Sequence, residues 1–244
     1  VMKVKEVMNP NVVSVSPYVK IIEAVDIMLT NNIRRLLVEG GMIVTIRDLV
    51  YAWERAEHSV STVATKDLLF VDPDVDVVEA AKIMTARGVG SLLVGDGVKV
   101  MGIVTERDVI KALRAKSNAL AKDVMNADPL TCVRDEALSE VVDLMRERWT
   151  RHAFVVDGES VVGVLSVRDI ARAMAARRDL RKVRVDEFMT LRVVSARPDD
   201  SLERVRELMA INNIGSVPVI DPNKGLVGAV GERDMLVALI VSSF

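Results

Sequence analysis

The sequence predicts an α+β fold built from four tandem repeats, each with the order strand, helix, strand, strand, helix. The first observation behind this prediction is a motif that occurs four times, as IVTIRDL, GIVTERDVI, GVLSVRDI and GAVGERDM. The second is its regular spacing, because successive terminal acids lie 60, 61 and 65 residues apart, at Asp48, Asp108, Asp169 and Asp234. A period of this size indicates one supersecondary unit repeated along the chain.

The second copy shows the element order most clearly. A short apolar run around Val71 predicts the first strand. The segment VDVVEAAKIM that follows has apolar residues at helical spacing, namely Val77, Ala80, Ala81 and Met84. The run SLLV, a turn through residues 95–97 and the run VKVMGIV predict a β-hairpin. A second helix, DVIKALRAK, is expected to follow Thr105.

The same apolar stripe recurs in all four first helices. Its reference position is a methionine, which occurs at Met28, Met84, Met145 and Met209. Further apolar side chains stand four and seven residues before it, namely Ala24, Ile21, Ala80, Val77, Val141, Leu138, Val205 and Leu202. Because methionine is unbranched and adaptable, we interpret its recurrence as core filling.

A short leader precedes the repeats as VKEVMNP, AKDVMNADP and VDEFMT, with a degraded copy, VSTVATKD, in the second. We place the repeats at residues 1–57, 58–117, 118–179 and 180–244. One unit of about sixty residues leaves an apolar sheet face uncovered, so the repeats are expected to pack in pairs, sheet against sheet. The first repeat is shorter, since its predicted hairpin is reduced at residues 39–41.

Composition excludes several classes of protein. With 33 basic and 35 acidic side chains, the net charge of -2 gives no overall attraction for nucleic acid or anionic membranes. No apolar run reaches the roughly 18 residues of a membrane helix and no signal segment opens the sequence, so we expect a cytoplasmic protein. A single cysteine, Cys132, and two histidines, His58 and His152, predict no disulfide framework and no metal site. They also offer no nucleophile and base for catalysis, so we expect neither an enzyme nor a catalytic cofactor.

A β-α-β-β-α repeat that ends in G-h-h-[ST]-x-R-[DN], where h is apolar, resembles the CBS domain. Four tandem copies are similar to the gamma subunit of AMP-activated protein kinase and to stand-alone archaeal CBS proteins. The resemblance implies that the repeats pair into two Bateman modules, which often form a flat disc. It also implies clefts between paired repeats that bind AMP, ADP or ATP, and in some members S-adenosylmethionine.

The motif hydroxyl and acid have two interpretations. By resemblance, each aspartate accepts hydrogen bonds from ribose hydroxyls, while Thr45, Thr105 and Ser166 contact ribose or phosphate. The alternative is a capping box, which satisfies free N–H groups at a helix start without any ligand. Gly231 replaces the hydroxyl in the fourth copy. We therefore rank the candidate sites in the order Asp108 and Asp169, then Asp48, then Asp234.

The arginine before each aspartate indicates an anion. It occurs in every copy, at Arg47, Arg107, Arg168 and Arg233. A positive charge in the first turn opposes the helix dipole, which favours anions there by about 0.3–1 kcal/mol. A bound phosphate would remove this conflict, because helix N-termini and guanidinium groups both bind anions. The alternative is that these arginines pair with a carboxylate across the module.

A second group of candidate residues lies between the first helix and the hairpin. The odd repeats carry Arg34-Arg35 and Arg151-His152, at positions where the kinase gamma subunit has His-Arg pairs that reach phosphates. The even repeats carry Gly90-Ser91 and Gly215-Ser216, small residues that would let a ligand approach the backbone. The alternation suggests that odd repeats supply charge and even repeats supply room. A solvated surface remains the alternative for the cations, and a half-buried ring for His152.

These observations favour a regulatory sensor that binds an adenine nucleotide and transmits its occupancy to a partner protein, with a homodimer also possible. One alternative is an S-adenosylmethionine-binding CBS protein. Another is a scaffold or nucleic-acid binder that uses the basic stretch 177–184, whose simpler interpretation is a solvated helix end. We expect no membrane partner, and a nucleic-acid partner is the less favoured of these possibilities.

Overall fold

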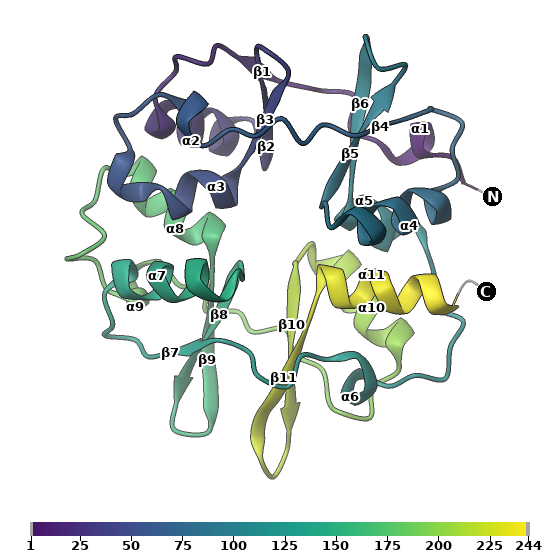
Figure 1. The fold of residues 1–244 in the computed structure, drawn as a ribbon. Helices are drawn as coiled ribbons and strands as arrows, with labels where there is room; N and C mark the ends of the chain where they lie inside the picture. Colours follow the sequence, from purple (N-terminus) through teal and green to yellow (C-terminus); the bar gives the residue numbers. More distant parts are fainter. Residues whose placement is uncertain (1, 243–244) are drawn as a thin grey trace. The chain divides into compact units, whose positions relative to one another are not determined.

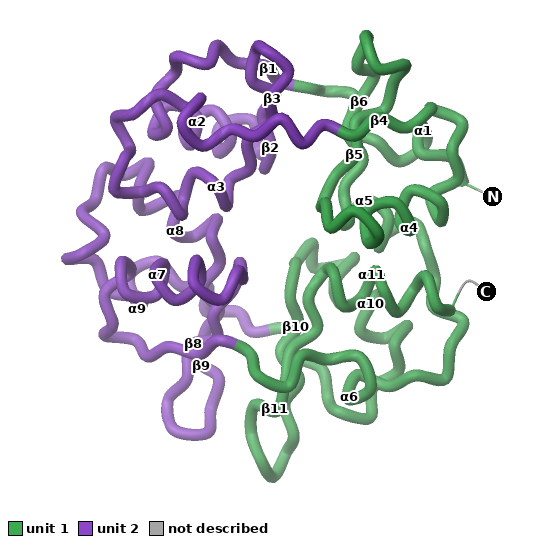
Figure 2. Tube along the Cα trace, viewed as in Figure 1, with its two compact units in different colours: residues 1–12, 69–129, 194–244 green, residues 13–68, 130–193 purple. Residues whose placement is uncertain are grey.

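The computed structural model describes residues 2–242 and divides into two compact units (Figures 1 and 2). Unit 1 comprises residues 1–12, 69–129 and 194–244, and unit 2 comprises residues 13–68 and 130–193. The second and fourth repeats therefore share unit 1, and the first and third share unit 2. Alternate repeats pack together, although neighbours in the sequence are joined by short connections.

Unit 2 contains two copies of a three-stranded sheet with its helices. The first repeat supplies β1 (Ser14–Val15), α2 (Ile21–Thr30), β2 (Arg35–Val38), β3 (Met42–Thr45), α3 (Ile46–Tyr51), η1 (Trp53–Arg55) and η2 (Val60–Thr62). The third supplies β7 (Thr131–Cys132), α7 (Leu138–Arg148), β8 (His152–Asp157), β9 (Ser160–Ser166) and α8 (Val167–Ala175), followed by α9 (Val185–Phe188). In each sheet the first pair of strands is parallel and the hairpin is antiparallel.

Unit 1 repeats this plan with one simplification. It contains α1 (Val4–Val7), β4 (Phe70–Val71), α4 (Val77–Arg87), β5 (Ser91–Gly95), β6 (Val100–Thr105), α5 (Glu106–Ala112) and α6 (Ala121–Val124). The fourth repeat adds α10 (Leu202–Asn212), β10 (Ser216–Asp221), β11 (Gly225–Gly231) and α11 (Glu232–Ser242). A single parallel bridge from Ala196 to Val219 replaces the first strand here. The predicted element order is otherwise confirmed, including the short hairpin at residues 39–41.

Each unit has its own hydrophobic core. The predicted methionine stripe is buried in all four helices, with Met28, Met84 and Met145 at 0% exposure and Met209 at 2%. Within unit 2, α8 packs on α2 and α3, and within unit 1, α5 packs on α10 and α11. Helices therefore form the contact between the two repeats of a unit, and the expected sheet-against-sheet packing is not the packing inside either unit. The amphipathic stripe of each helix favours this arrangement, because it buries apolar surface of both partners.

The leaders lie on the hairpin of the neighbouring repeat. Asn9 pairs with Ile103 of β6, and the degraded second leader pairs Thr65 with Ile43 of β3. The third and fourth leaders do the same on β11 and β9. Three leaders form one helical turn, while the degraded copy forms only the 3-10 turn η2. The first and second repeats thus exchange leaders, as do the third and fourth.

Side-chain volume is matched where leader and hairpin meet. A Cβ on Gly102 would lie 2.6 Å from the sulfur of Met8, and one on Gly163 would lie 2.9 Å from that of Met189. Gly228 is covered by Met125 in the same way. In the first repeat the sizes are reversed, because Met42 occupies the strand position and Ala64 the leader position. A methionine therefore stands on one side of each pairing of leader and hairpin, on the leader in three cases and on the strand in the first repeat.

We predict that Gly102→Ala destabilises the fold by about 1–3 kcal/mol, because the added methyl overpacks this contact. Combining it with Met8→Ala should recover part of that loss, since the sulfur clash disappears while the Asn9 carbonyl, 2.9 Å from the new Cβ, remains. Urea denaturation of wild type, both single variants and the double variant measures the coupling. Additive effects of the two substitutions would show that the contact is not volume-limited.

Candidate functional site

The turns that carry the repeated motif, called the signature turns after its arginine and aspartate, have the same structure in three repeats. The capping-box interpretation describes that local structure. The hydroxyls of Thr45 and Thr105 each donate to the Oδ2 of the aspartate three residues later at 2.9 Å. Ser166 donates to Asp169 Oδ2 at 3.1 Å. The aspartate N–H groups donate back to the hydroxyls at 3.2–3.3 Å. Each hydroxyl and its acid therefore start the second helix together.

The fourth turn keeps only half of this arrangement. Asp234 Oδ2 accepts the N–H of Gly231 at 2.9 Å, and the glycine offers no side-chain hydroxyl. Burial raises the pKa of Asp234, and the Gly231 N–H offsets part of that rise. The fourth turn therefore lacks the hydrogen bond between hydroxyl and acid that the other three turns have.

Asp169 is more enclosed than its counterparts. It is 3% exposed, whereas Asp48, Asp108 and Asp234 are half-buried. Its Oδ1 accepts from Arg172 at 2.7 Å and from the leader residue Thr190 at 3.3 Å. Burial raises the pKa of Asp169 although Ser166, Arg172 and Thr190 all favour the charged form. Both carboxylate oxygens of Asp169 are therefore occupied by the chain itself.

Two signature arginines form reciprocal ion pairs within unit 1. Arg107 Nη2 lies 3.2 Å from Glu232 Oε1, and Arg233 Nε lies 2.7 Å from Glu106 Oε2. Glu106 and Glu232 are the first residues of α5 and α11, and they are 2% and 6% exposed. The sequence left two interpretations of the motif arginines, an anionic ligand or a carboxylate of another repeat. In unit 1 both arginines pair with such a carboxylate.

Three signature arginines also reach the end of the partner repeat's first helix. Arg107 donates to the carbonyl of Asn213 at 3.3 Å, and Arg168 donates to Asn32 Oδ1 at 2.7 Å. The guanidinium carbon of Arg47 lies 4.1 Å from the centre of the Trp149 ring. The residues contacted have left-handed backbones that end α10, α2 and α7. Because a helix C-terminus is its negative end, it stabilises a cation that opposes the dipole of its own helix.

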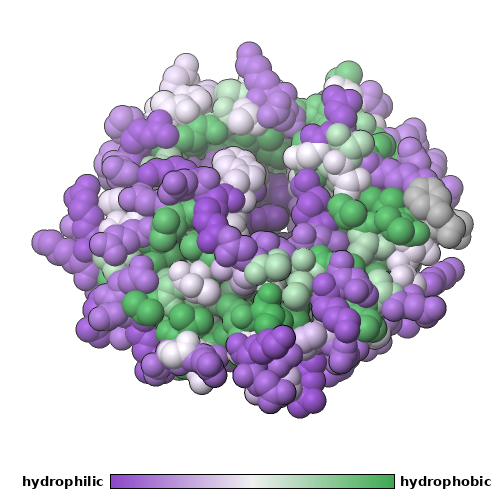
Figure 3. Space-filling view, turned by 60° about the horizontal axis from the view of Figure 1, so that its bottom comes forward, coloured by the Kyte–Doolittle hydropathy of each residue, from purple (hydrophilic) through white to green (hydrophobic). Residues whose placement is uncertain are grey.

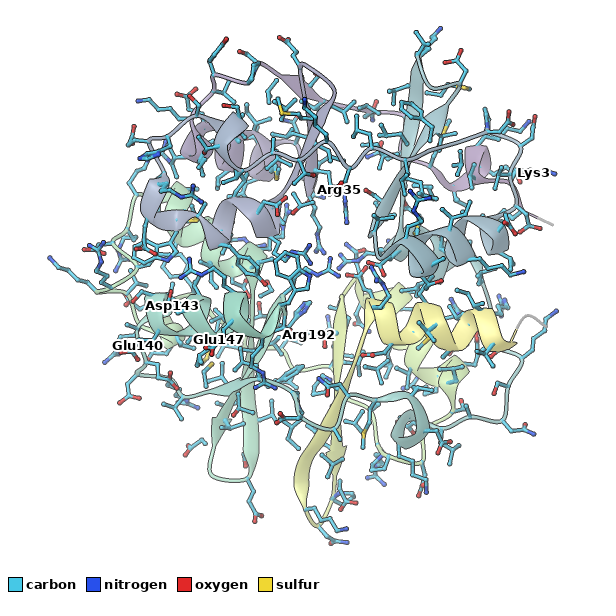
Figure 4. The ribbon with its side chains drawn as sticks, viewed as in Figure 1. Lys3, Arg35, Glu140, Asp143, Glu147 and Arg192 are labelled. Atoms are coloured by element: carbon cyan, nitrogen blue, oxygen red, sulfur yellow. The ribbon has the colours of Figure 1, made fainter. Side chains whose placement is uncertain are left out.

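The second group of candidate residues separates by unit. Arg34 and Arg151 accept, through their carbonyls, the N–H groups that begin α3 and α8 in unit 2. Arg35, labelled in Figure 4, opens β2 and pairs with Thr45 at the start of α3. His152 opens β8 and pairs with Ser166 at the start of α8. Gly90, Ser91, Gly215 and Ser216 take the same places in unit 1. The structure thus collects the predicted cations in one unit and the small residues in the other.

The basic stretch 177–184 has partners within unit 2. Arg177 forms two hydrogen bonds with Asp26, at 2.8 and 3.0 Å, and Arg178 pairs with Glu187 at 2.9 Å. Arg184 pairs with Asp186 at 3.1 Å, and Arg181 lies over the Trp53 ring. These contacts account for four of the cations by intramolecular pairing, which weakens the case for a nucleic-acid surface.

The one cysteine of the sequence lies in the hydrophobic core of unit 2. Cys132 is 3% exposed, and burial raises its thiol pKa to about 12, so the thiolate is scarce at neutral pH. Within residues 2–242, no group of three or more His, Cys, Asp or Glu side chains is placed to hold a metal ion. None of the described helices has the length and apolar character of a membrane span, and hydrophilic side chains cover much of the face in Figure 3.

Comparison with known proteins identifies the repeat. The CBS domain model matches four times, at residues 4–55, 60–115, 121–176 and 185–241. The chain belongs to the CBS-domain family. CBS repeats of this kind thus account for nearly all of the sequence, and the sequence-based recognition of the family is confirmed.

Relatives of this CBS protein include the uncharacterised MJ1225 of Methanocaldococcus jannaschii. It is 27% identical over 97% of both chains. The crystal structure of MJ1225, described as that of a candidate archaeal homologue of g-AMPK, superposes with a TM-score of 0.80 at 25% identity, over 97% of this chain and 99% of its own. A protein from Pyrococcus horikoshii shares the fold, with a TM-score of 0.66 at 22% identity, over 98% of this chain and 100% of its own.

Some curated relatives are enzymes that share only part of their length with this chain. The homoserine O-acetyltransferase of Methanosalsum zhilinae is 30% identical over 49% of this CBS protein, which spans 24% of the enzyme. The match covers a region of CBS repeats, so the acetyltransferase activity of that protein is not carried over.

Sequence reasoning missed Glu106, Glu232 and Trp149. The two glutamates were detectable, because the even copies of the motif read ERD where the odd copies read IRD and VRD. Trp149 was also visible as the residue that ends α7, the first helix of the third repeat, where the other repeats have Asn32, Gly88 and Asn213. What the sequence did not show is which repeat faces which, and so which charges meet.

We predict that Arg107→Met destabilises the protein by about 3 kcal/mol, because it removes a partner of the buried Glu232 carboxylate. The double variant Arg107→Met with Glu232→Ile should recover most of the lost stability, since the odd repeats have an apolar residue at the position of Glu232. Denaturant titration of the three variants measures this difference. The control is Lys5→Met, which breaks an exposed pair with Asp74 and should cost less than about 1 kcal/mol. Equal losses in Arg107→Met and Lys5→Met would contradict the prediction.

Proposed function

We propose that this CBS protein is a regulatory sensor of adenine nucleotides, which binds the phosphates of AMP, ADP or ATP with the cations of unit 2. The observation that supports this proposal is the separation of charge between the units. In unit 1, the arginines at the starts of α5 and α11 are neutralised by Glu106 and Glu232. In unit 2, Ile46 and Val167 stand at the corresponding positions, so the motif adds cations without adding these acids.

The cations of unit 2 are grouped at the starts of α3 and α8. They are Arg34, Arg35, Arg47, Arg151, His152 and Arg168. Arginine binds phosphate through two parallel hydrogen bonds, and charge-assisted bonds of this kind are about twice as strong as neutral ones. Such a group suits a ligand that carries several negative charges. It is not required by S-adenosylmethionine, which has no phosphate.

The ribose would be held by the signature aspartates. A carboxylate accepts two hydrogen bonds and a vicinal diol offers two, so the half-buried Asp48 suits this role in unit 2. Asp169 suits it less, because Arg172 and Thr190 already donate to its second oxygen. The likeness to MJ1225, with its link to g-AMPK, supports the same ligand class.

Occupancy would be transmitted to a partner protein through the two units. The chain passes between them at residues 12–13, 68–69, 129–130 and 193–194. Each passage follows a leader that is paired with a hairpin strand directly before a signature turn. A ligand that favours one arrangement of the units over another would shift their equilibrium by its difference in affinity, commonly about 1–3 kcal/mol.

The test is calorimetric titration with adenosine, AMP, ADP, ATP and S-adenosylmethionine. We expect Arg34→Ala and Arg151→Ala each to weaken ATP binding by about 10- to 100-fold, because each removes a charged hydrogen-bond donor. Adenosine binding should change little. The control is Arg87→Ala, which alters an exposed arginine of α4 in unit 1. If ATP binds no more tightly than adenosine, or if no nucleotide binds, the proposal is wrong.

We further expect Asp48→Asn to weaken the binding of adenosine and ATP by a similar factor, because it reduces the acceptor capacity for ribose. Asp169→Asn should have a smaller effect, since its carboxylate is enclosed. Because Asp48 also caps α3, a loss of about 1 kcal/mol in stability accompanies the change, and titrations are made well below the melting temperature. Equal effects of both variants would contradict this ranking.

A further inference from the structure

The hydroxyl of Thr190 contacts a signature aspartate from outside its own repeat. Thr190 is the leader residue that pairs with Val164 of β9, and its Oγ1 donates to Asp169 Oδ1 at 3.3 Å. The corresponding residues of the other leaders are Asn9, Thr65 and Asn126. The two asparagines accept N–H groups of their own leaders. Among these four leader residues of the described chain, Thr190 is therefore the one that is hydrogen-bonded to a signature aspartate.

The carboxylate of Asp169 is covered by two side chains. Its Oδ2 accepts the N–H and the hydroxyl of Ser166, as in the other complete signature turns. Its Oδ1 accepts from Thr190 and, at 2.7 Å, from Arg172. Thr190 and Arg172 are themselves exposed, whereas Asp169 is 3% exposed. The cover over Asp169 is thus made at the surface, where side chains can rearrange without disturbing the core of unit 2.

The first repeat of the same unit lacks this cover. Asp48 Oδ2 accepts the N–H and the hydroxyl of Thr45 in the same way, yet Asp48 is half-buried. Tyr51 stands where the third repeat has Arg172, and its hydroxyl donates to two carbonyls of the third repeat instead. The leader residue is again a threonine, but within residues 2–242 Thr65 forms no hydrogen bond with Asp48. The two aspartates of unit 2 therefore differ in their cover although their turns are alike.

We propose that Thr190 is an autoinhibitory latch, which together with Arg172 closes the Asp169 carboxylate to the ribose of a nucleotide. This inference rests on the proposed binding of nucleotides by unit 2. A ribose hydroxyl needs the acceptor that the Thr190 hydroxyl uses, so the two donors compete for one oxygen. Unit 2 then has an open site at Asp48 and a closed site at Asp169, and the closed site fills only at a higher nucleotide concentration.

The latch connects occupancy of Asp169 with the chain that joins the units. The Thr190 N–H donates to the Val164 carbonyl at 2.8 Å, and the Val164 N–H donates back at 3.0 Å. Shortly after this pairing, at residues 193–194, the chain passes to unit 1. Linked equilibria are reciprocal. A nucleotide that displaces the Thr190 hydroxyl therefore weakens the docking of this leader by the same factor by which the docked leader weakens nucleotide binding.

The test is calorimetric titration of the full chain with ATP, comparing wild type with Thr190→Ala. Removing the hydroxyl should tighten the weaker ATP-binding event by about three- to tenfold, the range expected for one hydrogen bond that no longer competes. The melting temperature should stay equal or fall, because the same hydrogen bond is lost from the fold. Affinity and stability then change in opposite directions, which a purely structural contact would not produce. Thr190→Ser keeps the hydroxyl and should behave like wild type.

Two control variants and one further measurement locate the effect. Thr65→Ala alters the same leader position without touching Asp48, so ATP affinity should be unchanged. In an Asp169→Asn background, Thr190→Ala should no longer tighten the weaker event, because the carboxylate that it uncovers is gone. Saturating ATP should also speed hydrogen exchange of the Thr190 amide in wild type by about three- to tenfold.

The outcomes separate the latch from the proposed function. If Thr190→Ala binds ATP like wild type or more weakly, the latch is wrong, and the proposed function stands provided that Arg34→Ala weakens ATP binding. If neither wild type nor Thr190→Ala binds any nucleotide, both are wrong.

Discussion

Each repeat places an arginine beside the positive end of its own second helix, and the packing of alternate repeats resolves this conflict. The partner repeat brings the negative end of its first helix to the same place, so that Arg107 and Arg168 meet the caps at Asn213 and Asn32. Helix-to-helix packing within a unit is therefore an electrostatic match as well as an apolar one. The residues that contact the motif arginines differ between the two units.

The two units differ in the residues that contact the motif arginines at these helix ends. Unit 1 adds glutamates, which are buried, and each of them forms an ion pair with the motif arginine of the other repeat. Unit 2 adds Asn32 and Trp149, which hold the arginines without adding charge. Under the proposed function, the same motif would stabilise the fold in unit 1 and contact the ligand in unit 2. The motif alone does not show which role a copy has.

The sequence predicted the local elements well because their signals are local. The methionine stripe, the hairpins and the capping hydroxyls follow from spacing within a few residues, and all are present. It predicted less where the outcome depends on distant partners. The burial of Asp169 depends on Thr190 of the next leader, and the pairing of Arg233 depends on Glu106, more than one hundred residues away. The sequence also did not predict that the first strand of the fourth repeat is reduced to a single bridge at Ala196, because a single bridge and a two-residue strand have similar sequences.

The exchange of leaders sets a limit on how such a chain can evolve. The first leader covers the hairpin of the second repeat, the second covers that of the first, and the later two repeats do likewise. Loss of one repeat would leave a hairpin bare and a leader without a surface to cover. Gain of one repeat would do the same. Duplications and deletions that keep the protein folded are therefore expected to add or remove two repeats at a time.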